Sequence, residues 1–187
     1  MNFTMGLSTI DMQSFSKLLY RCSVFTLTTL KEVEDKTIEE LKTSAATPLV
    51  KTLQMVRLDK VIFAVGMFSV FEALLQDRLN CNNGFTEAKN ILRQAGETTL
   101  LEQFSDIELA VNALKHGQGR SYNALIAKNS GTLAAQVKRR SENIFIEGDI
   151  SEVSALVDVD DKFIDGCVDV IEKVSKVIQD NRPDVFL

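Results

Sequence analysis

The chain has 187 residues, of which 45% are hydrophobic and 25% are charged, and its formal net charge at pH 7 is −5. This composition is typical of a globular protein that needs no disulfide or metal to fold, and the length fits one domain over residues 1–187. The acidic balance excludes a protein built to coat nucleic acid non-specifically, although it leaves room for a local basic patch.

The cysteines and the N-terminal sequence bear on the compartment. Cys22, Cys81 and Cys167 are far apart, and no pair has metal-ligand spacing. We therefore expect free thiols in a reducing compartment, a cytoplasmic protein, and no metal or cofactor. The first residues do not resemble a signal peptide, and the most apolar run, 61–75, is interrupted by polar residues and falls short of the roughly 20 residues of a bilayer span. We expect no membrane association.

The first predicted helix follows a short irregular start. Residues 1–8 have no periodicity, and we expect them to fray. From about residue 9 or 11, apolar side chains recur at steps of three and four, which predicts a long amphipathic helix. The residues expected on its buried face are Phe15, Leu18, Leu19, Cys22, Phe25 and Leu27. Threonine and valine in 24–30 allow a bend or a break, and the charged run 31–42 predicts a solvent-facing helix.

A second helix is predicted from Pro48 to about Asn80, with Thr47 as its cap and the proline in its first turn. Its second half, 61–79, is apolar almost all round, which is typical of the central helix of a bundle.

Glu72 lies in a thin polar stripe of this central helix. A buried carboxylate without a partner is costly. Glu72 is therefore expected either to reach solvent at an edge or to meet a donor such as His116, Arg120 or Asn112.

A turn over 80–84 separates this helix from two shorter ones. The first shorter helix is predicted from the spacing of Ala88, Ile91, Leu92 and Ala95, and we expect Gly96 to end it. The next one leads to the only histidine of the chain, His116. Its predicted buried face consists of Ile107, Ala110, Val111 and Leu114, and its predicted polar face of Glu108, Asn112, Lys115 and His116.

The end of that helix is the predicted site. Gly117 is expected to stop the helix, because glycine adopts the left-handed conformation at the lowest cost, and Ser121 is expected to cap another short helix. Asn112 and His116 are one turn apart, and Lys115 and Arg120 are close in sequence. We therefore expect an imidazole, an amide, an ammonium and a guanidinium to be crowded together.

The remaining segments are shorter. Two short helices are predicted, around 122–126 and 133–137, and the basic triplet 138–140 fits either a solvated helix end or a phosphate contact. Two β-branched segments, 143–147 and 155–159, predict a small β-hairpin. The last helix is predicted to be capped by Asp160 and ended by Pro183. Its apolar stripe consists of Phe163, Cys167, Val170, Ile171, Val174 and Ile178.

Together these elements predict an all-α fold. We expect a mostly antiparallel bundle of four or more long helices, with a short β-hairpin near 143–158.

The helix that closes with Asn-Ala-Leu-Lys-His (112–116), preceded by an apolar helix with Phe71-Glu72, resembles the HEPN superfamily. The resemblance is best over residues 48–122. In that superfamily an arginine, often followed by Asn, His or Asp, precedes a histidine on the same helix. Its active members are metal-independent endoribonucleases that usually work as dimers, with the two Arg/His pairs meeting at the interface. The resemblance implies a homodimer that cleaves RNA or serves as a non-catalytic helper, in RNA processing, toxin–antitoxin systems or phage defence.

The chain departs from this pattern at the arginine. Val111 occupies the arginine position, and the nearby guanidinium, Arg120, comes four residues after His116. Two hypotheses therefore stay open. In the first, the chain is a non-catalytic or regulatory homodimeric module with RNA or a protein as partner, and His116 is favoured simply by the helix dipole.

In the second hypothesis, the chain is a metal-independent endoribonuclease. His116 is then the general acid or base, and Arg120 or Lys115 binds phosphate. Asn112 and Glu72 would orient these groups.

Overall fold

The computed structural model describes residues 14–128, 133, 136–137 and 156–185. These residues form six helices and no strand, so the predicted all-α class is confirmed. The helices are α1 (Phe15–Leu41), α2 (Thr47–Leu79), α3 (Gly84–Gln94), α4 (Thr98–His116), α5 (Arg120–Ala127) and α6 (Asp161–Asn181). No helix among them is long and apolar enough to cross a membrane.

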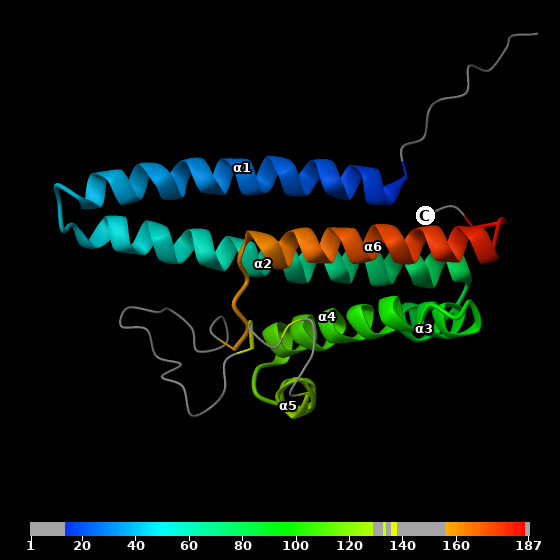
Figure 1. Ribbon diagram of the computed structural model, residues 1–187. Coiled ribbons are helices and arrows are strands. Elements are labelled where there is room, and N and C mark those ends of the chain that lie inside the picture. Colours follow the sequence, from blue (N-terminus) through cyan, green and yellow to red (C-terminus); the bar gives the residue numbers. More distant parts are fainter. Residues whose placement is uncertain (1–13, 129–132, 134–135, 138–155, 186–187) are drawn as a thin grey trace, which may run out of the picture.

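The two longest helices, α1 and α2, form an antiparallel hairpin, and α6 lies beside both (Figure 1). Helices α3 and α4 lie on the side of α2 away from α1, and α5 packs against α4 alone. Helix α2 contacts α1, α3, α4 and α6. The predicted central position of α2 is therefore confirmed, and the bundle has at least the four long helices expected.

The helix ends follow local chemistry. Asp160 caps α6, as predicted, by accepting from the Phe163 N–H at 2.8 Å. Asn83, in the predicted turn, caps α3, with its Oδ1 accepting from the Thr86 N–H at 2.8 Å. The predicted cap at Thr47 is wrong. Ala46 precedes α2 without a side-chain cap, and Thr47 is already helical, because Pro48 fixes the backbone of the first turn.

Aromatic rings fill the core between α2, α3 and α4. Phe68 and Phe71 of α2 contact Phe85 of α3 and Phe104 of α4, and each of the four side chains is at most 7% exposed. The closest pair, Phe85 and Phe104, has ring centroids 5.3 Å apart at an interplanar angle of 90°, the edge-to-face geometry that aromatic pairs favour.

A buried lysine links three helices. Lys60 of α2 is 9% exposed, and its Nζ lies 2.8 Å from Asp161 Oδ1 of α6 and 3.5 Å from Glu34 Oε2 of α1. Burial alone would lower the pKa of Lys60, but the two carboxylates outweigh it and hold the pKa above its ordinary value of 10.5. The ammonium therefore stays charged and links α1, α2 and α6.

The buried face of α1 differs from the predicted one. Helix α1 is continuous through 24–30, without a break, and it buries Leu19, Ser23, Leu30 and Thr37. Leu18 and Cys22 are exposed, and Phe25 is 73% exposed. Apolar residues occur on several sides of this helix, so their spacing does not single out the face that α2 and α6 cover.

The predicted β-hairpin falls partly outside the described residues, as do 1–8 and the basic triplet 138–140. Its first half, 143–147, is not described. In its second half, Val157 forms a single antiparallel bridge with Val137, and the Asp158 N–H donates to the Gln136 carbonyl at 2.8 Å. The described partner of this segment is therefore 136–137, where one of the short helices was predicted.

Candidate functional site

The end of α4 is built as the sequence predicts. Ile107, Ala110, Val111 and Leu114 are each at most 5% exposed and pack into the core. Gly117 follows with a φ of 74°, a left-handed value that glycine accepts without a side-chain clash, and its N–H donates to the Ala113 carbonyl at 2.8 Å. Helix α4 therefore ends at His116 and the chain turns directly towards α5.

The start of α5 corrects one prediction. Gly119 is the residue before the helix, Arg120 is its first residue, and Ser121 lies inside the first turn without acting as a cap. Tyr122 and Leu125, which are 2% and 5% exposed, hold this short helix against the core. Arg120 is consequently placed on the solvent side of the first turn of α5.

The predicted cluster is mostly exposed, and its members are not linked to one another by hydrogen bonds or ion pairs. Lys115, His116 and Arg120 are exposed, and Asn112 is half-buried. Within the described residues, no hydrogen bond or ion pair joins these four side chains or gives any of them a side-chain partner. They share one end of α4 and the start of α5, but the structure does not assemble them into a preorganised site.

Glu72 does not join this group. Its side chain is half-buried on α2, and none of the described donors, including the three that the sequence suggested, pairs with it. Its backbone carbonyl lies against the start of α3, where a Cβ added to Gly84 would be 2.7 Å from the Glu72 oxygen. Glu72 thus follows the first of its two predicted alternatives, an edge position that reaches solvent.

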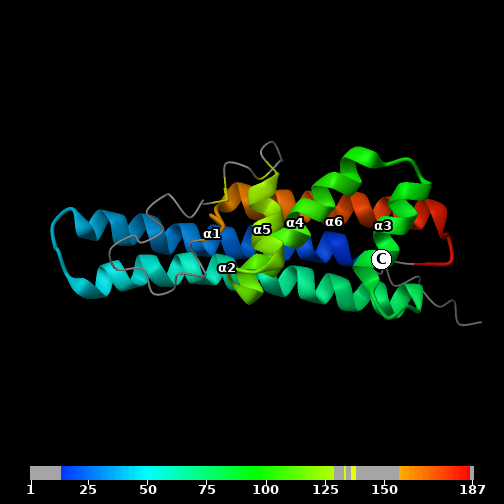
Figure 2. The same ribbon diagram turned by 90° about the horizontal axis from the view of Figure 1, so that it is seen from below.

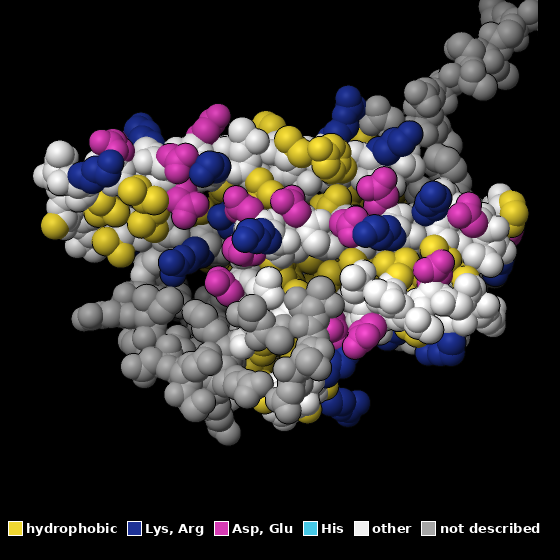
Figure 3. Space-filling view, viewed as in Figure 1, with side chains coloured by type: hydrophobic (Ala, Val, Ile, Leu, Met, Phe, Trp, Pro, Cys, Tyr) yellow, Lys and Arg dark blue, Asp and Glu magenta, His cyan; other side chains and the backbone are white. Residues whose placement is uncertain are grey.

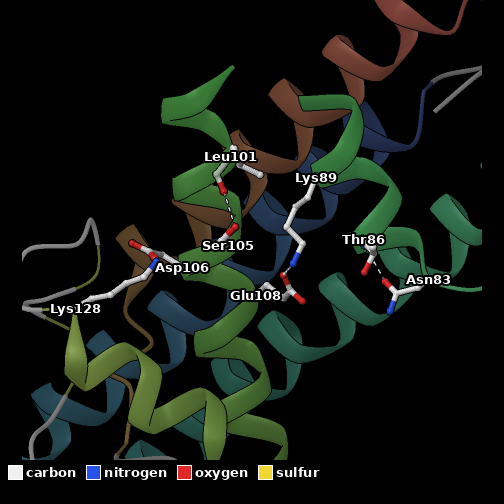
Figure 4. A network of polar contacts seen from close by, with 8 residues as sticks. All are labelled: Asn83, Thr86, Lys89, Leu101, Ser105, Asp106, Glu108 and Lys128. Carbon is white, nitrogen blue, oxygen red and sulfur yellow. Dashed lines mark hydrogen bonds and ion pairs between the residues drawn. The ribbon is translucent and has the colours of Figure 1, made fainter. Parts of the chain in front are cut away.

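A different polar contact fixes α5, and sequence reasoning missed it. Asp106 of α4 is 1% exposed, and its Oδ1 pairs with the Nζ of Lys128, the residue that ends α5 (Figure 4). Its second oxygen, Oδ2, is buried without a hydrogen-bond partner among the described residues. The sequence feature that could have revealed this contact is an aspartate between Phe104 and Ile107, on a helix whose neighbouring positions are buried.

A second ion pair joins α3 to the same helix. Lys89 Nζ lies 2.7 Å from Glu108 Oε2, and both side chains are largely buried, at 25% and 19% exposure (Figure 4). Glu108 was predicted on the polar face of α4, and this contact gives it a structural partner. The polar face of α4 is therefore partly used to hold α3, whereas Lys115 and His116 in its last turn stay exposed.

The hollows of the surface lie elsewhere. One of about 490 Å³ between α1 and α6 is lined by Ser16, Lys17, Tyr20, Arg21 and Glu172. A smaller hollow of about 150 Å³ lies between α4, α6 and the turn at 133–137, and a third lies along the outer side of α1. None of these three is lined by His116, Arg120 or Asn112. Among the described residues, no group of three or more His, Cys, Asp or Glu side chains is arranged to hold a metal ion.

Comparison with protein-family models, with curated proteins and with solved structures finds no match to this chain.

Proposed function

We propose that this protein is an interaction module that works through the outer surface of its α1–α2 hairpin. One observation carries the proposal: all ten large hydrophobic side chains that are exposed in the described part of the chain belong to these two helices. They are Leu18, Tyr20, Val24, Phe25, Ile38, Val50, Met55, Leu58, Ile62 and Val70.

The concentration of exposed hydrophobic residues on two helices favours the binding of a partner. Single exposed apolar residues are ordinary on any protein, but apolar residues gathered on one part of a surface are typical of interaction sites. In Figure 3, apolar side chains are visible over α1 and at the far end of the hairpin. Helices α3 to α6 carry no large exposed hydrophobic residue within the described ranges. The hairpin is therefore the part of the molecule best suited to a protein partner.

In this proposal the module is non-catalytic or regulatory and acts as a homodimer. The resemblance of Phe71-Glu72 and 112–116 to the HEPN superfamily suggests RNA processing, toxin–antitoxin function or phage defence as its setting. The exposed, unconnected state of His116 and Arg120 agrees with a non-catalytic role, because catalysis usually relies on groups held in place by their neighbours.

A second candidate function is metal-independent cleavage of RNA. It is favoured by the exposure of both His116 and Arg120 at adjoining helix ends, where no side-chain partner within the described residues competes for a phosphate. Lys115 is exposed beside them. In this alternative, His116 would transfer a proton and Arg120 would stabilise charge on the phosphate.

The two candidates are separated by incubating the purified protein with a pool of structured RNAs in EDTA. The interaction role predicts no cleavage. Cleavage by the wild type that is lost in His116→Ala and in Arg120→Ala would instead establish the ribonuclease. Arg93→Ala is the matched control, because Arg93 is an exposed arginine near the end of α3, next to the start of α4 and not to its end. Sedimentation velocity on the same preparation then measures whether the protein is a dimer.

A further inference from the structure

One face of α2 stays uncovered along most of its length. The residues that share this face, spaced by three and four, are Met55, Leu58, Ile62, Val65, Gly66, Ser69, Val70 and Ala73. We refer to them as the α2 stripe. Four of its members are large and exposed, from 38% for Leu58 to 58% for Ile62. At 1.5 Å per residue the stripe is about 27 Å long.

Between its two ends the α2 stripe carries one charge, at Asp59, which is half-buried and shares the face with Met55 and Ile62. No charged residue occurs between Lys60 and Glu72. A solvent-facing helix of a globular protein typically has charged or polar residues opposite its buried side. The composition of this face is that of a helix–helix contact.

Gly66, in the middle of the stripe, is not explained by packing within the chain. It is exposed, and a Cβ placed on it would meet no atom within 4 Å. A glycine in a helix interior is less favourable than alanine, so its presence calls for a different reason. Close approach of a second backbone at this point supplies one, as Gly84 illustrates within the chain: an added Cβ there would be 2.7 Å from the α2 backbone.

Neighbouring helices leave this face open. Figure 2 shows α2 along one edge of the bundle, with α1 and α6 on its other side. On α1, Ser16 and Tyr20 line the hollow shared with Glu172 of α6. Phe25 lines the hollow along the outer side of α1, together with Tyr20 and Arg21.

We infer that the α2 stripe binds the α2 stripe of a second copy of this chain, with the two helices antiparallel about a two-fold axis near Gly66. The inference rests on the proposed interaction role and names its partner. It follows from the distribution of side-chain sizes: the three largest residues, Met55, Leu58 and Ile62, precede Gly66, and Ser69, Ala73 and the smallest of the exposed apolar residues, Val70, follow it. In an antiparallel pair with its axis at Gly66, Ile62 of one copy lies opposite Val70 of the other, and Leu58 lies close to Ala73.

The charges at the two ends of the stripe fit the same arrangement. Lys51, one turn before Met55, is exposed, and Asp77, one turn after Ala73, has 78% of its side chain exposed. In an antiparallel pair with its axis at Gly66, Lys51 of one copy lies about 6 Å further along the helix than Asp77 of the other, within reach of the long lysine side chain. A parallel pair would instead place like charges together, which opposes association.

The exposed area of the stripe suits a weak dimer. Its four large residues together expose about 300–400 Å² of apolar surface per copy, taking on the order of 150–200 Å² for each side chain when free. This is below the roughly 800 Å² per partner of a standard interface and is in the range of weak, transient ones. We expect a reversible dimer.

The first test is sedimentation velocity of Gly66→Arg over a range of protein concentrations. The position is exposed and arginine is a good helix former, so the fold is expected to persist by circular dichroism. Dimerisation is expected to weaken by more than roughly tenfold, because two like charges would face each other at the axis. Arg57→Glu, a charge change on the same helix but off the stripe, is the matched control and leaves association unchanged.

Disulfide cross-linking tests the geometry. In a Cys22→Ser background, which removes the exposed native thiol, Gly66→Cys is expected to form a covalent dimer, because disulfides need Cα atoms within about 7 Å. Met55→Cys is not expected to form a covalent dimer, since the two cysteines would lie about 33 Å apart in the antiparallel pair. Cross-linking through Met55→Cys would mean a parallel pair and would overturn the inference.

The remaining outcomes separate this inference from the proposed function. A wild-type dimer that survives Gly66→Arg and does not cross-link through Gly66→Cys overturns the α2 stripe as its interface and leaves the homodimeric role standing. A protein that stays monomeric at every concentration overturns both the inference and the homodimer.

Discussion

Asp106 is the buried carboxylate on which the position of α5 depends. Lys128→Met would leave its charge buried and unpaired, and we expect a loss of about 2 kcal/mol in the free energy of unfolding, since the lysine itself is part-exposed. In an Asp106→Asn background the same lysine substitution is expected to cost much less. Urea denaturation of the four proteins of this double-mutant cycle measures the coupling. Additive effects would contradict the ion pair.

The three thiols are expected to react in order of their exposure. Cys22 is exposed, whereas Cys167 is fully buried in α6, and burial raises the pKa of its thiol well above the ordinary value. A thiol-specific reagent is expected to label Cys22 in the native protein and Cys167 only after unfolding. Mass spectrometry of labelled peptides distinguishes them. Labelling of Cys167 at the rate of Cys22 would mean that α6 opens readily.

At the scale of elements, the joint between α2 and α3 is sterically tight. Gly84 begins α3 so close to α2 that an added Cβ would be 2.7 Å from the Glu72 carbonyl oxygen and 2.7 Å from Leu75 Cβ. Gly84→Ala is therefore expected to destabilise the protein by roughly 1–3 kcal/mol, because backbone atoms cannot move aside cheaply.

The matched control for this joint is Gly166→Ala in α6, where a Cβ would meet nothing within 4 Å. That change is expected to be neutral or to stabilise by a few tenths of a kcal/mol up to about 1 kcal/mol. Thermal melts of the two variants and the wild type provide the comparison. If Gly84→Ala has the same melting temperature as the wild type, α3 is not held against α2 as described.

Helix bounds could be predicted because they depend on neighbouring residues. Pro48, Asn83, Gly117 and Asp160 act within one turn of the helix ends that they set. The buried face of α1 could not be predicted, because apolar residues on several of its sides compete for the same core, and only the positions of α2 and α6 decide between them.

The candidate site was predictable only in outline. The end of α4 and the neighbouring positions of Asn112 and His116 follow from the sequence, because they depend on helical spacing alone. The separation of Glu72 from His116, and the pairing of Asp106 with Lys128, depend on how distant segments pack. Side chains 22 residues apart are brought together by the turn into α5, which no local pattern reveals.

At the scale of the whole molecule, Lys60 makes the free energy of unfolding depend on pH in the alkaline range. Its pKa is raised in the folded state above 10.5, so the stabilisation from its two carboxylate partners is complete below that pH and is lost as the pH rises through the folded pKa. Lys60→Met is expected to remove the part of the fall in stability that occurs as the pH rises above about 10.5. Lys51→Met, an exposed lysine on the same helix, should leave that fall unchanged. Urea midpoints at several pH values measure it.

The packing of α6 against both α1 and α2 has a consequence for synthesis on the ribosome. The core is completed by the helix that emerges last of the six, so a nascent chain that has reached only α5 cannot yet cover the sides of α1 and α2 that α6 will occupy. During that interval the hairpin displays apolar surface on two sides instead of one. The growing chain is then most exposed to chaperones and to premature pairing with other nascent copies.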